Sequence, residues 1–333
     1  MIEIHERIIQ NLSSHLSAEV TQKYGAHPDQ RIQKQLHDEL AAMVNSKGLF
    51  GFAAAYEMTL FLRANHWPYK LNGAVSSSFI AYLLGMTLTN PLQAHQVCPN
   101  CNLIVWRNKE YEDGFDIPPM ACSNCGNEME SDGHDIDWRI FWLDPTPVTE
   151  ILVAISERQE IVKWLEENEI LKSLGQMDQH IAEDGELFSA QWTGFNCVLV
   201  GESELLSNIY EPKATAKEKR KLIENWITKK QCTLKELEVT FSDFLRQVGK
   251  DYQMSVGDSC RISFRDDLFK QLKNYGFDDQ EAWNGMKQAS RGKGLPPCAS
   301  KQFDQWFLDE CKTLKYVWPK SACVENVLFQ NRK

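Results

Sequence analysis

Four cysteines between positions 98 and 125 are the residues of this sequence best suited to do chemistry. Cys98 and Cys101 form one Cys-x-x-Cys pair, Cys122 and Cys125 form another, and twenty residues separate the pairs. Zinc prefers four tetrahedral ligands, and a two-residue spacer lets one tight turn present two sulfurs to the same ion. Gly126 fits such a turn after the second pair. Four thiolates leave no open coordination position, so the sequence predicts a structural zinc site rather than a catalytic one.

The remaining cysteines and the nearby histidines have a simpler interpretation. His95 and His134 flank the pairs, and we expect ordinary histidines there rather than further metal ligands. The chain is too long and too rich in core residues for a secreted disulfide scaffold. We therefore expect buried free thiols at Cys197, Cys232, Cys260, Cys298, Cys311 and Cys323.

Composition and charge narrow the class of protein. The chain has 333 residues, 43% of them hydrophobic and 25% charged, which is typical of a globular protein with two or three domains. Its formal charge of −10 argues against binding nucleic acid by bulk charge, while a local basic patch stays compatible with it. The apolar stretches are shorter than the roughly 18 residues that cross a bilayer, and no signal peptide is visible. We expect a cytoplasmic protein without a membrane partner.

The elements before the zinc pairs are predicted as helices. Residues 3–24 have apolar residues at helical spacing, and this helix stops at Gly25. Asp29 caps a second helix, which Gly48 terminates. A serine cluster precedes a further apolar helix that ends at Gly85.

The elements after the zinc pairs are predicted as a mixture of strands, helices and a loop. Residues 137–143 resemble a strand, and Thr146-Pro147 opens a long helix over residues 148–169. Residues 175–190 are polar and are expected to form a loop, whereas residues 195–201 form a short buried strand. The rest is nearly all helical, with capping boxes expected at Thr233 with Glu236 and at Ser263 with Asp266.

Two blocks of sequence resemble a known family. The first runs from "HDELAAMVNSKG" through "DGFDIPPMACSNCGNEMESDGHDI", and the second contains "RGKGL" and "KYVWPK". Both are similar to the PolC-type DNA polymerase III alpha subunit, the first to its palm-proximal segment with an embedded zinc band and the second to its fingers. Together they span about residues 30–143 and 260–323, in the order of the family.

The resemblance implies a fold and a division of the chain. We expect an α+β, mainly helical protein with partial polymerase palm and fingers architecture and an inserted four-cysteine zinc module. The expected regions are a helical, palm-like 1–95, a zinc module at 96–137, a divergent α/β region at 138–255 and a helical, fingers-like 256–333.

The departures from the family concern its catalytic residues. The Gly-Ser pair that holds nucleotide phosphates in the family reads Gly73-Ala74 here, and the neighbouring basic position is Asn72. Where the family has two metal-binding aspartates after the zinc band, this chain offers Asp144 alone. The strand at 195–201, expected to carry a third aspartate, has no carboxylate, and a histidine position near the end is Ala322. Because two-metal phosphoryl transfer needs several oxygen ligands, we expect a truncated, catalytically dead relative.

Other residues of the family pattern are retained. Four cations match fingers positions that face nucleotide and template, and two of them flank glycines that would let a phosphate approach the backbone; their alternative interpretation is solvated helix ends. The hydroxyls and N–H groups of the serine cluster could hold phosphate at a helix start, or could simply cap the helix. The nucleotide- or DNA-binding candidates are therefore Ser76, Ser77, Ser78, Arg291, Lys293, Lys315 and Lys320.

The sequence is compatible with three functions. The first is a non-catalytic PolC-like protein of replication, or of a phage, mobile element or defence locus, that binds DNA or a replisome partner. The second is a minimal polymerase or nucleotidyltransferase with displaced metal ligands taken from Asp132, Asp135, Asp137 or Asp144. The third is a zinc-stabilised interaction scaffold.

The end of the sequence suggests one partner. Glu325, Leu328 and Phe329 resemble the short peptides that dock on bacterial sliding clamps, if they lie on a flexible tail; the alternative is a plain helix.

Overall fold

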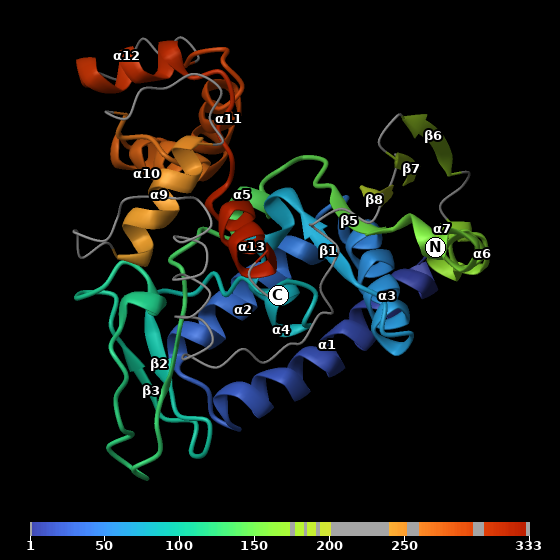
Figure 1. Cartoon of the computed structure of the whole chain (residues 1–333), viewed down its shortest axis with the longest axis horizontal. Coiled ribbons are helices and arrows are strands. Elements are labelled where there is room, and N and C mark those ends of the chain that lie inside the picture. The colour runs from blue at the N-terminus through green and yellow to red at the C-terminus, as the bar shows by residue number, and fades with distance from the viewer. Residues whose placement is uncertain are drawn as a thin grey trace.

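The computed structural model describes residues 2–173, 177–182, 185–190, 194–200, 240–251, 260–295 and 303–330. These residues form an α+β, mainly helical protein with two small sheets, as the sequence predicts (Figure 1). No helix in these ranges is long and apolar enough to cross a bilayer. The capping box at residues 233–236, Cys232 and Cys298 lie outside the described residues, and the division at residues 95, 137 and 255 remains a prediction.

The N-terminal helices form the main core. Helix α1 (Ile2–Tyr24) buries a stripe of apolar residues at four-residue intervals, which are Ile8, Leu12, Leu16, Val20 and Tyr24. It stops at Gly25, whose φ of +81° ends the helix as predicted. Asp29 caps α2 (Gln30–Val44) by accepting from the Arg31 N–H, but α2 ends before Gly48, which instead precedes α3 (Leu49–Ala64).

The larger sheet has five strands in the order β1-β5-β8-β7-β6. The strands are β1 (Tyr69–Asn72), β5 (Thr149–Ala154), β6 (Asp178–Ala182), β7 (Gly185–Ala190) and β8 (Phe195–Val200). Among these described strands, β5 and β8 pair in parallel and the other neighbours pair antiparallel. One face packs against α3 through residues such as Ile151, Val153 and Phe195, which are fully buried. The strand predicted at residues 195–201 is confirmed as β8.

Three predictions in this region are wrong. Residues 148–169 do not form one helix, because residues 149–154 pair with β1 and β8 before η3 (Ile155–Glu157), α6 (Arg158–Glu167) and α7 (Glu169–Ser173). The polar segment expected as a loop contains the β6–β7 hairpin. Residues 137–143 contain the short helix α5 (Arg139–Trp142), because the Asp137 side chain accepts from the Arg139 N–H at 3.0 Å and starts a turn.

A smaller, three-stranded sheet carries the cysteine pairs. It consists of β2 (His95–Val97), β3 (Ile104–Trp106) and β4 (Glu130–Asp132), in the order β3-β2-β4. The short helix η2 (Gly114–Asp116) lies between β3 and β4 in the chain. Upstream, η1 (Gly73–Ser77) and α4 (Phe79–Leu83) connect it to the main body, and α4 ends just before Gly85 as predicted.

The last helices form a separate cluster and then return to the body. The cluster holds α10 (Arg265–Asn274), α11 (Asp279–Ala289) and α12 (Gln305–Thr313), with α9 (Phe241–Asp251) beside it (Figure 1). The expected pairing of Ser263 with Asp266 is wrong, because Asp267 accepts the N–H groups of Ser263 and Phe264. Finally, α13 (Lys320–Gln330) packs against η1 and α9, and the Lys70 ammonium group on β1 donates to the Asn326 side chain on α13.

Candidate metal centre and cationic surface

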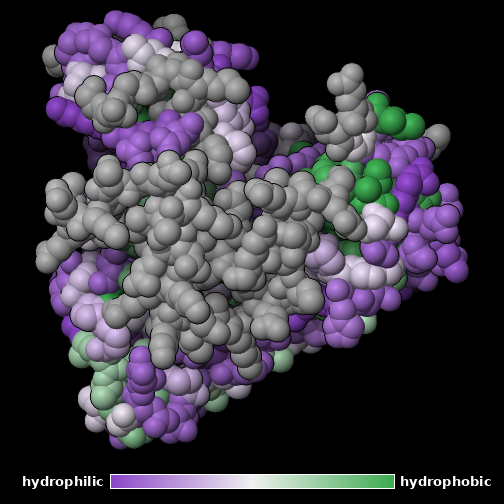
Figure 2. All heavy atoms as spheres, viewed as in Figure 1, coloured by the Kyte–Doolittle hydropathy of each residue, from purple (hydrophilic) through white to green (hydrophobic). Residues whose placement is uncertain are grey.

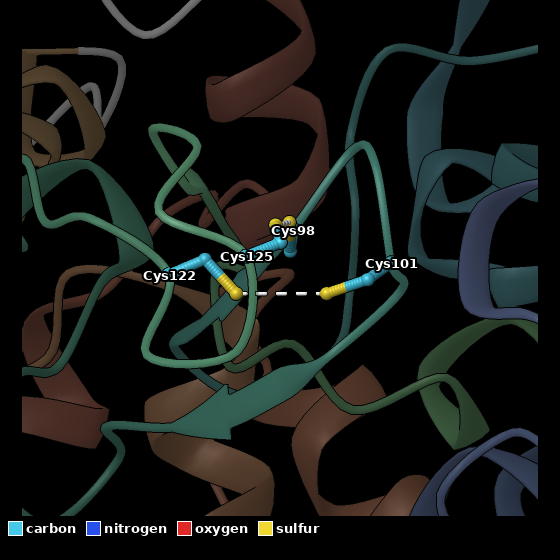
Figure 3. A group of neighbouring side chains, drawn as sticks. All are labelled: Cys98, Cys101, Cys122 and Cys125. Atoms are coloured by element: carbon cyan, nitrogen blue, oxygen red, sulfur yellow. Dashed lines mark hydrogen bonds between the residues drawn. The ribbon is translucent and has the colours of Figure 1, made fainter.

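The four cysteines converge at the tip of the smaller sheet (Figure 3). All four sulfurs lie within 4.8 Å of one another, with Cys98 and Cys125 sulfurs 3.4 Å apart and Cys101 and Cys122 sulfurs 3.5 Å apart. None forms a disulfide. Tetrahedral ligands about 2.3 Å from one ion would be separated by nearly these distances, so the residues fit a four-thiolate metal ion.

Two matched turns build this geometry. In the first, the Asn102 N–H donates to the Cys98 carbonyl at 2.9 Å, and in the second the Gly126 N–H donates to the Cys122 carbonyl at 2.8 Å. Both donors are left-handed, with φ of +57° at Asn102 and +77° at Gly126. The turn expected at Gly126 is therefore present, and its counterpart at Asn102 is built without glycine.

The surroundings of the thiols favour thiolates at two positions. Hydrogen bonds from the Asn124 side chain and then from the Leu103 N–H lower the pKa of Cys101 to about 6. The Asn127 N–H lowers the pKa of Cys125. Burial raises the pKa of Cys98 to about 11. A bound cation would be needed to hold this last sulfur as a thiolate at neutral pH.

The first turn also fastens the module to the helical body. The Asn102 side-chain amide donates to the carbonyls of Lys23, at 3.1 Å, and Gln22, at 3.3 Å, at the end of α1. These are carbonyls that a helix C-terminus leaves without an intrahelical partner. A change that disorders the metal-binding turn is therefore expected to destabilise the C-terminal end of α1 as well.

The flanking histidines do not join the cysteine group in the described part of the chain. The His95 ring donates from Nδ1 to the Gln93 carbonyl at 2.7 Å. His134 Nδ1 lies 2.8 Å from the Asp113 carboxylate, and both side chains are fully buried. Each histidine therefore makes a hydrogen bond inside the protein, as expected for an ordinary histidine.

The serine cluster lies inside the protein. Ser76, Ser77 and Ser78 are fully buried, the Ser77 hydroxyl donates to the Ala74 carbonyl at 2.7 Å, and the Ser78 side chain caps α4. The Glu39 carboxylate lies at the same helix start, where it accepts from the Ser78 hydroxyl and from the Phe79 N–H at 3.0 Å. An internal carboxylate thus takes the position that a phosphate would need, and phosphate binding by these serines remains only a prediction.

Stability should decrease between about pH 4.5 and pH 7 because of Glu39. Burial raises its pKa from 4.5 to about 7, so the folded protein holds this proton more tightly than the unfolded chain does. Ionisation of Glu39 therefore lowers the free energy of unfolding as the pH rises. This loss is absent below pH 4.5 and complete above pH 7, where it reaches about 3 kcal/mol. Urea unfolding should show a flatter pH profile for Glu39→Gln. The exposed Glu167→Gln should keep the wild-type profile, and identical profiles for all three proteins would contradict the assignment.

Three of the four predicted cations lie together on the surface. Arg291, Lys293 and Lys315 are exposed on two adjoining turns, residues 290–294 and 314–317, which we call the cationic turn pair. The Val317 N–H donates to the Ser290 carbonyl at 2.9 Å and joins the turns. The lobe that carries α10 to α12 is largely hydrophilic on the face shown in Figure 2. The arrangement is suited to binding a polyanion.

Glycine has a packing role in the turn pair. Gly292 has a φ of +72°, and a Cβ there would lie 3.1 Å from the carbonyl oxygens of Leu314 and Lys315. The N–H groups of Arg291, Gly292 and Lys293 donate to carbonyls at the end of α11. These three N–H groups are therefore already hydrogen-bonded, whereas a Cβ at Gly294 would meet no atom within 4 Å, so the approach of a phosphate to the backbone stays a prediction there. The exposed side chains of Arg291, Lys293 and Lys315 are available to an anion.

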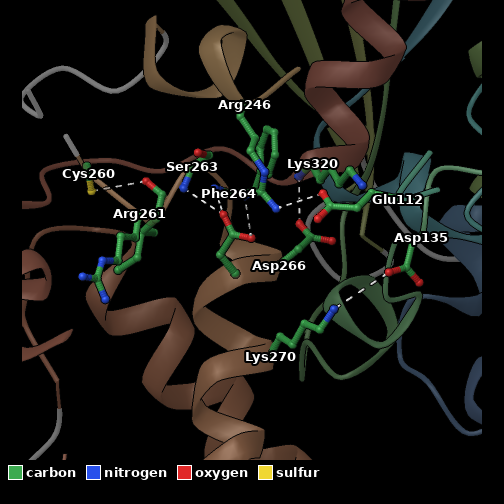
Figure 4. Close-up of polar contacts among 12 residues, drawn as sticks. Glu112, Asp135, Arg246, Cys260, Arg261, Ser263, Phe264, Asp266, Lys270 and Lys320 are labelled. Carbon is green, nitrogen blue, oxygen red and sulfur yellow. Dashed lines mark hydrogen bonds and ion pairs between the residues drawn. The ribbon is translucent and has the colours of Figure 1, made fainter. Parts of the chain in front are cut away.

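Lys320 lies at the start of α13, beside Asp266 (Figure 4). Its backbone N–H donates to Asp266 at 2.8 Å, and its ammonium group donates to the His134 carbonyl. Burial raises the pKa of Asp266 to about 6. Lys320 thus joins α13 to α10 and to the zinc module, and its predicted contact with nucleic acid is not supported by its placement.

The acids considered as displaced metal ligands do not converge in the described residues. Asp132 accepts from the Tyr82 hydroxyl at 2.7 Å, and Asp144 pairs with Lys287 at 3.2 Å. Asp135 faces Lys270 across 3.9 Å (Figure 4), and Asp137 pairs with Arg139 at 2.6 Å. Each acid is engaged in a separate local contact.

Sequence reasoning missed a different polar group on the larger sheet. Glu150 on β5 lies in register between Asn72 on β1 and Asn196 on β8. Its carboxylate accepts from the Asn72 amide at 2.7 Å and from the Asn196 amide at 3.2 Å. The group was missed because residues 148–169 were assigned to a helix, which separates Glu150 from both partners.

The residues proposed for clamp docking are buried in α13. Glu325 is 2% exposed, Leu328 7% and Phe329 2%. A flexible tail with free anchors is therefore wrong, and the alternative, a plain helix, is confirmed.

Comparison with known proteins finds a partial similarity to one kind of DNA polymerase. No family model matches the chain. It is 32% identical over 142 residues to the PolC-type DNA polymerase III of Thermotoga petrophila, a match that covers 42% of this chain and 10% of that protein. About two fifths of this chain is similar to PolC-type DNA polymerase III. The proteins of that name from Streptococcus thermophilus and Streptococcus suis are 33% and 32% identical over 129 and 145 residues.

The matches confirm the PolC resemblance and limit its extent. They cover 37% to 42% of this chain, less than the two sequence blocks together. The chain spans about a tenth of the length of the PolC-type proteins it matches. The activities of the whole polymerase therefore do not transfer with the match, and palm or fingers architecture remains a proposal.

Proposed function

We propose that this chain is a non-catalytic PolC-like protein that binds DNA in the cytoplasm, in replication or in a phage, mobile-element or defence setting. Its similarity to PolC-type DNA polymerase III supports a role connected with DNA. The cationic turn pair carries the proposal, because it gathers Arg291, Lys293 and Lys315 on an exposed surface of a chain whose formal charge is −10. The palm-like and fingers-like regions would act as a scaffold for this surface.

The metal of the cysteine group is proposed to be zinc. Four thiolates in tetrahedral reach favour zinc over oxygen-loving cations, and a closed set of four protein ligands is typical of structural sites. The ion would hold the two turns together, and through Asn102 it would support the end of α1.

Binding of a primer-template should weaken steeply with salt. Three side-chain contacts, each with a salt slope of about −0.7 to −0.9, give a total of about −2 to −3 between 50 and 200 mM salt. The double change Arg291→Glu with Lys293→Glu should reduce affinity by about tenfold or more and flatten the slope. Fluorescence anisotropy of a labelled primer-template measures both quantities.

A matched control separates local from general charge. Lys163→Glu with Lys172→Glu makes the same charge change on α6 and α7, at exposed positions away from the turn pair. Affinity and slope should then stay closer to wild type. If both double variants weaken binding equally, or if no binding is measurable at about 50 mM salt, the turn pair is not a DNA-binding surface.

Primer extension should be absent with Mg²⁺ and with Mn²⁺. The acids near the zinc module are engaged in separate contacts, and a two-metal reaction needs several carboxylates around one position. A gel assay with a labelled primer tests this. Extension above background that disappears in Asp144→Asn would instead support the minimal polymerase.

A replisome protein is the second candidate partner. The formal charge of −10 opposes long-range approach to DNA and favours a protein surface over DNA alone. DNA binding should follow the charge of Arg291 and Lys293, whereas a pull-down from a lysate tests for a protein partner.

A further inference from the structure

The row Asn72–Glu150–Asn196 places three polar side chains in register on adjacent strands. Neighbouring strands are about 4.8 Å apart, so side chains at paired positions on one face are within reach of one another. All three residues are partly exposed, whereas alternate residues of β5 and β8, such as Ile151 and Cys197, are fully buried against the other side. The row therefore lies on the sheet face opposite the α3 core.

Hydrogen bonding in the row satisfies the central carboxylate. One Glu150 oxygen accepts from the Asn72 amide at 2.7 Å and the other from the Asn196 amide at 3.2 Å. An ionised carboxylate accepts but does not donate, so both amides must turn their N–H groups toward it. The oxygen atoms of the amides are then directed away from Glu150.

This orientation matters for cations. Mg²⁺ and Mn²⁺ bind carboxylate and carbonyl oxygens, and they do not bind an amide N–H group. An ion beside Glu150 would have to displace two hydrogen bonds and would gain only one charged ligand. If the two amides were carboxylates of the same shape, three negative groups would meet in one row, and like charges at that spacing repel unless a cation lies between them.

We propose that Asn72 and Asn196 close a divalent-cation position around Glu150. The two amides occupy the place of the ion, hold the carboxylate by hydrogen bonds and keep β1, β5 and β8 in register without metal. In this arrangement, no metal is needed at the sheet. The proposal is independent of DNA binding by the cationic turn pair, so each of the two proposals can fail without the other.

Exchanging the amides for carboxylates should open the position. Zinc-loaded protein with Asn72→Asp and Asn196→Asp should bind about one Mn²⁺ at least tenfold more tightly than wild-type protein does. Isothermal titration and the electron paramagnetic resonance signal of free Mn²⁺ both report this. Adding Glu150→Gln to the double variant should remove the gained site.

Controls make each outcome decisive. Asn45→Asp with Asn65→Asp adds the same charge at the ends of α2 and α3 and should gain no site. If the double variant fails to fold, as circular dichroism and zinc content would reveal, the single Asn196→Asp should show a smaller gain that still depends on Glu150. The proposal is overturned if wild-type protein binds Mn²⁺ in a way that Glu150→Gln abolishes. It is equally overturned if folded Asp variants gain nothing over the control.

Discussion

Replacing Cys98 with serine should remove stoichiometric zinc and cause a large loss of stability. Cys98 is fully buried, its sulfur lies 3.4 Å from that of Cys125, and the turn after it carries the Asn102 contact to α1. Metal binding by a structural site is coupled to folding, and apparent binding energies are about 10–16 kcal/mol in small zinc peptides. In a larger protein, we expect a drop of about 10 °C or more in Tm.

Hydrogen exchange should show where this stability is lost. Protection should fall in the three-stranded sheet and at the end of α1, because Asn102 connects the two. Cys197→Ser is the matched control, since it changes a fully buried thiol in the larger sheet. That variant should lose some stability but keep its zinc. Full zinc content in Cys98→Ser, or zinc loss in Cys197→Ser, would contradict the assignment of the ligands.

Local signals predicted those features that depend on neighbours in sequence. The stop of α1 at Gly25, the Asp29 cap and the serine cap of α4 each involve residues within a few positions. The cysteine turns belong to the same class, because spacing within each pair and the residue that follows decide the turn. These features could be read without knowing which segments meet in space.

Features that depend on strand pairing could not be predicted from local signals. Residues 149–154 include Glu, Ile, Leu and Ala, all compatible with a helix, but pairing with β1 and β8 makes them a strand. The polar β6–β7 hairpin lacks the apolar alternation that signals a strand, and its pairing with β8 stabilises it. Glu150 could be connected with Asn72 and Asn196 only through that register.

The candidate binding residues show the same difference between local signals and the path of the chain in space. Arg291, Lys293 and Lys315 were grouped by resemblance, and the adjoining turns do bring them together. Lys320 belongs to the same sequence motif as Lys315, but α13 starts there and turns the side chain toward the His134 carbonyl. Proximity in sequence was therefore a poor guide at the point where the chain returns to the N-terminal region.

Glu325→Ala should detach α13 from the body and cost about 3–5 kcal/mol of unfolding free energy. The Glu325 carboxylate accepts from the hydroxyls of Thr87, at 2.5 Å, and Thr89, at 2.7 Å, and from the N–H groups of Leu88 and Thr89 at 3.0 and 3.1 Å. Alanine would leave these buried donors without an acceptor, and each unsatisfied donor costs about 1–3 kcal/mol before relaxation.

A conservative variant at Glu325 and a variant of an exposed glutamate test whether the lost hydrogen bonds cause the loss of stability. Glu325→Gln keeps one acceptor oxygen and should lose less stability than alanine, because part of the donor set stays satisfied. Glu167→Ala removes an exposed carboxylate from α6 and should change unfolding by less than about 0.5 kcal/mol. Urea unfolding measures all three variants, and hydrogen exchange should show lost protection in α13 and at residues 87–89. A loss below about 1 kcal/mol in Glu325→Ala would mean that apolar packing by residues such as Val324 and Phe329 holds α13 without the carboxylate.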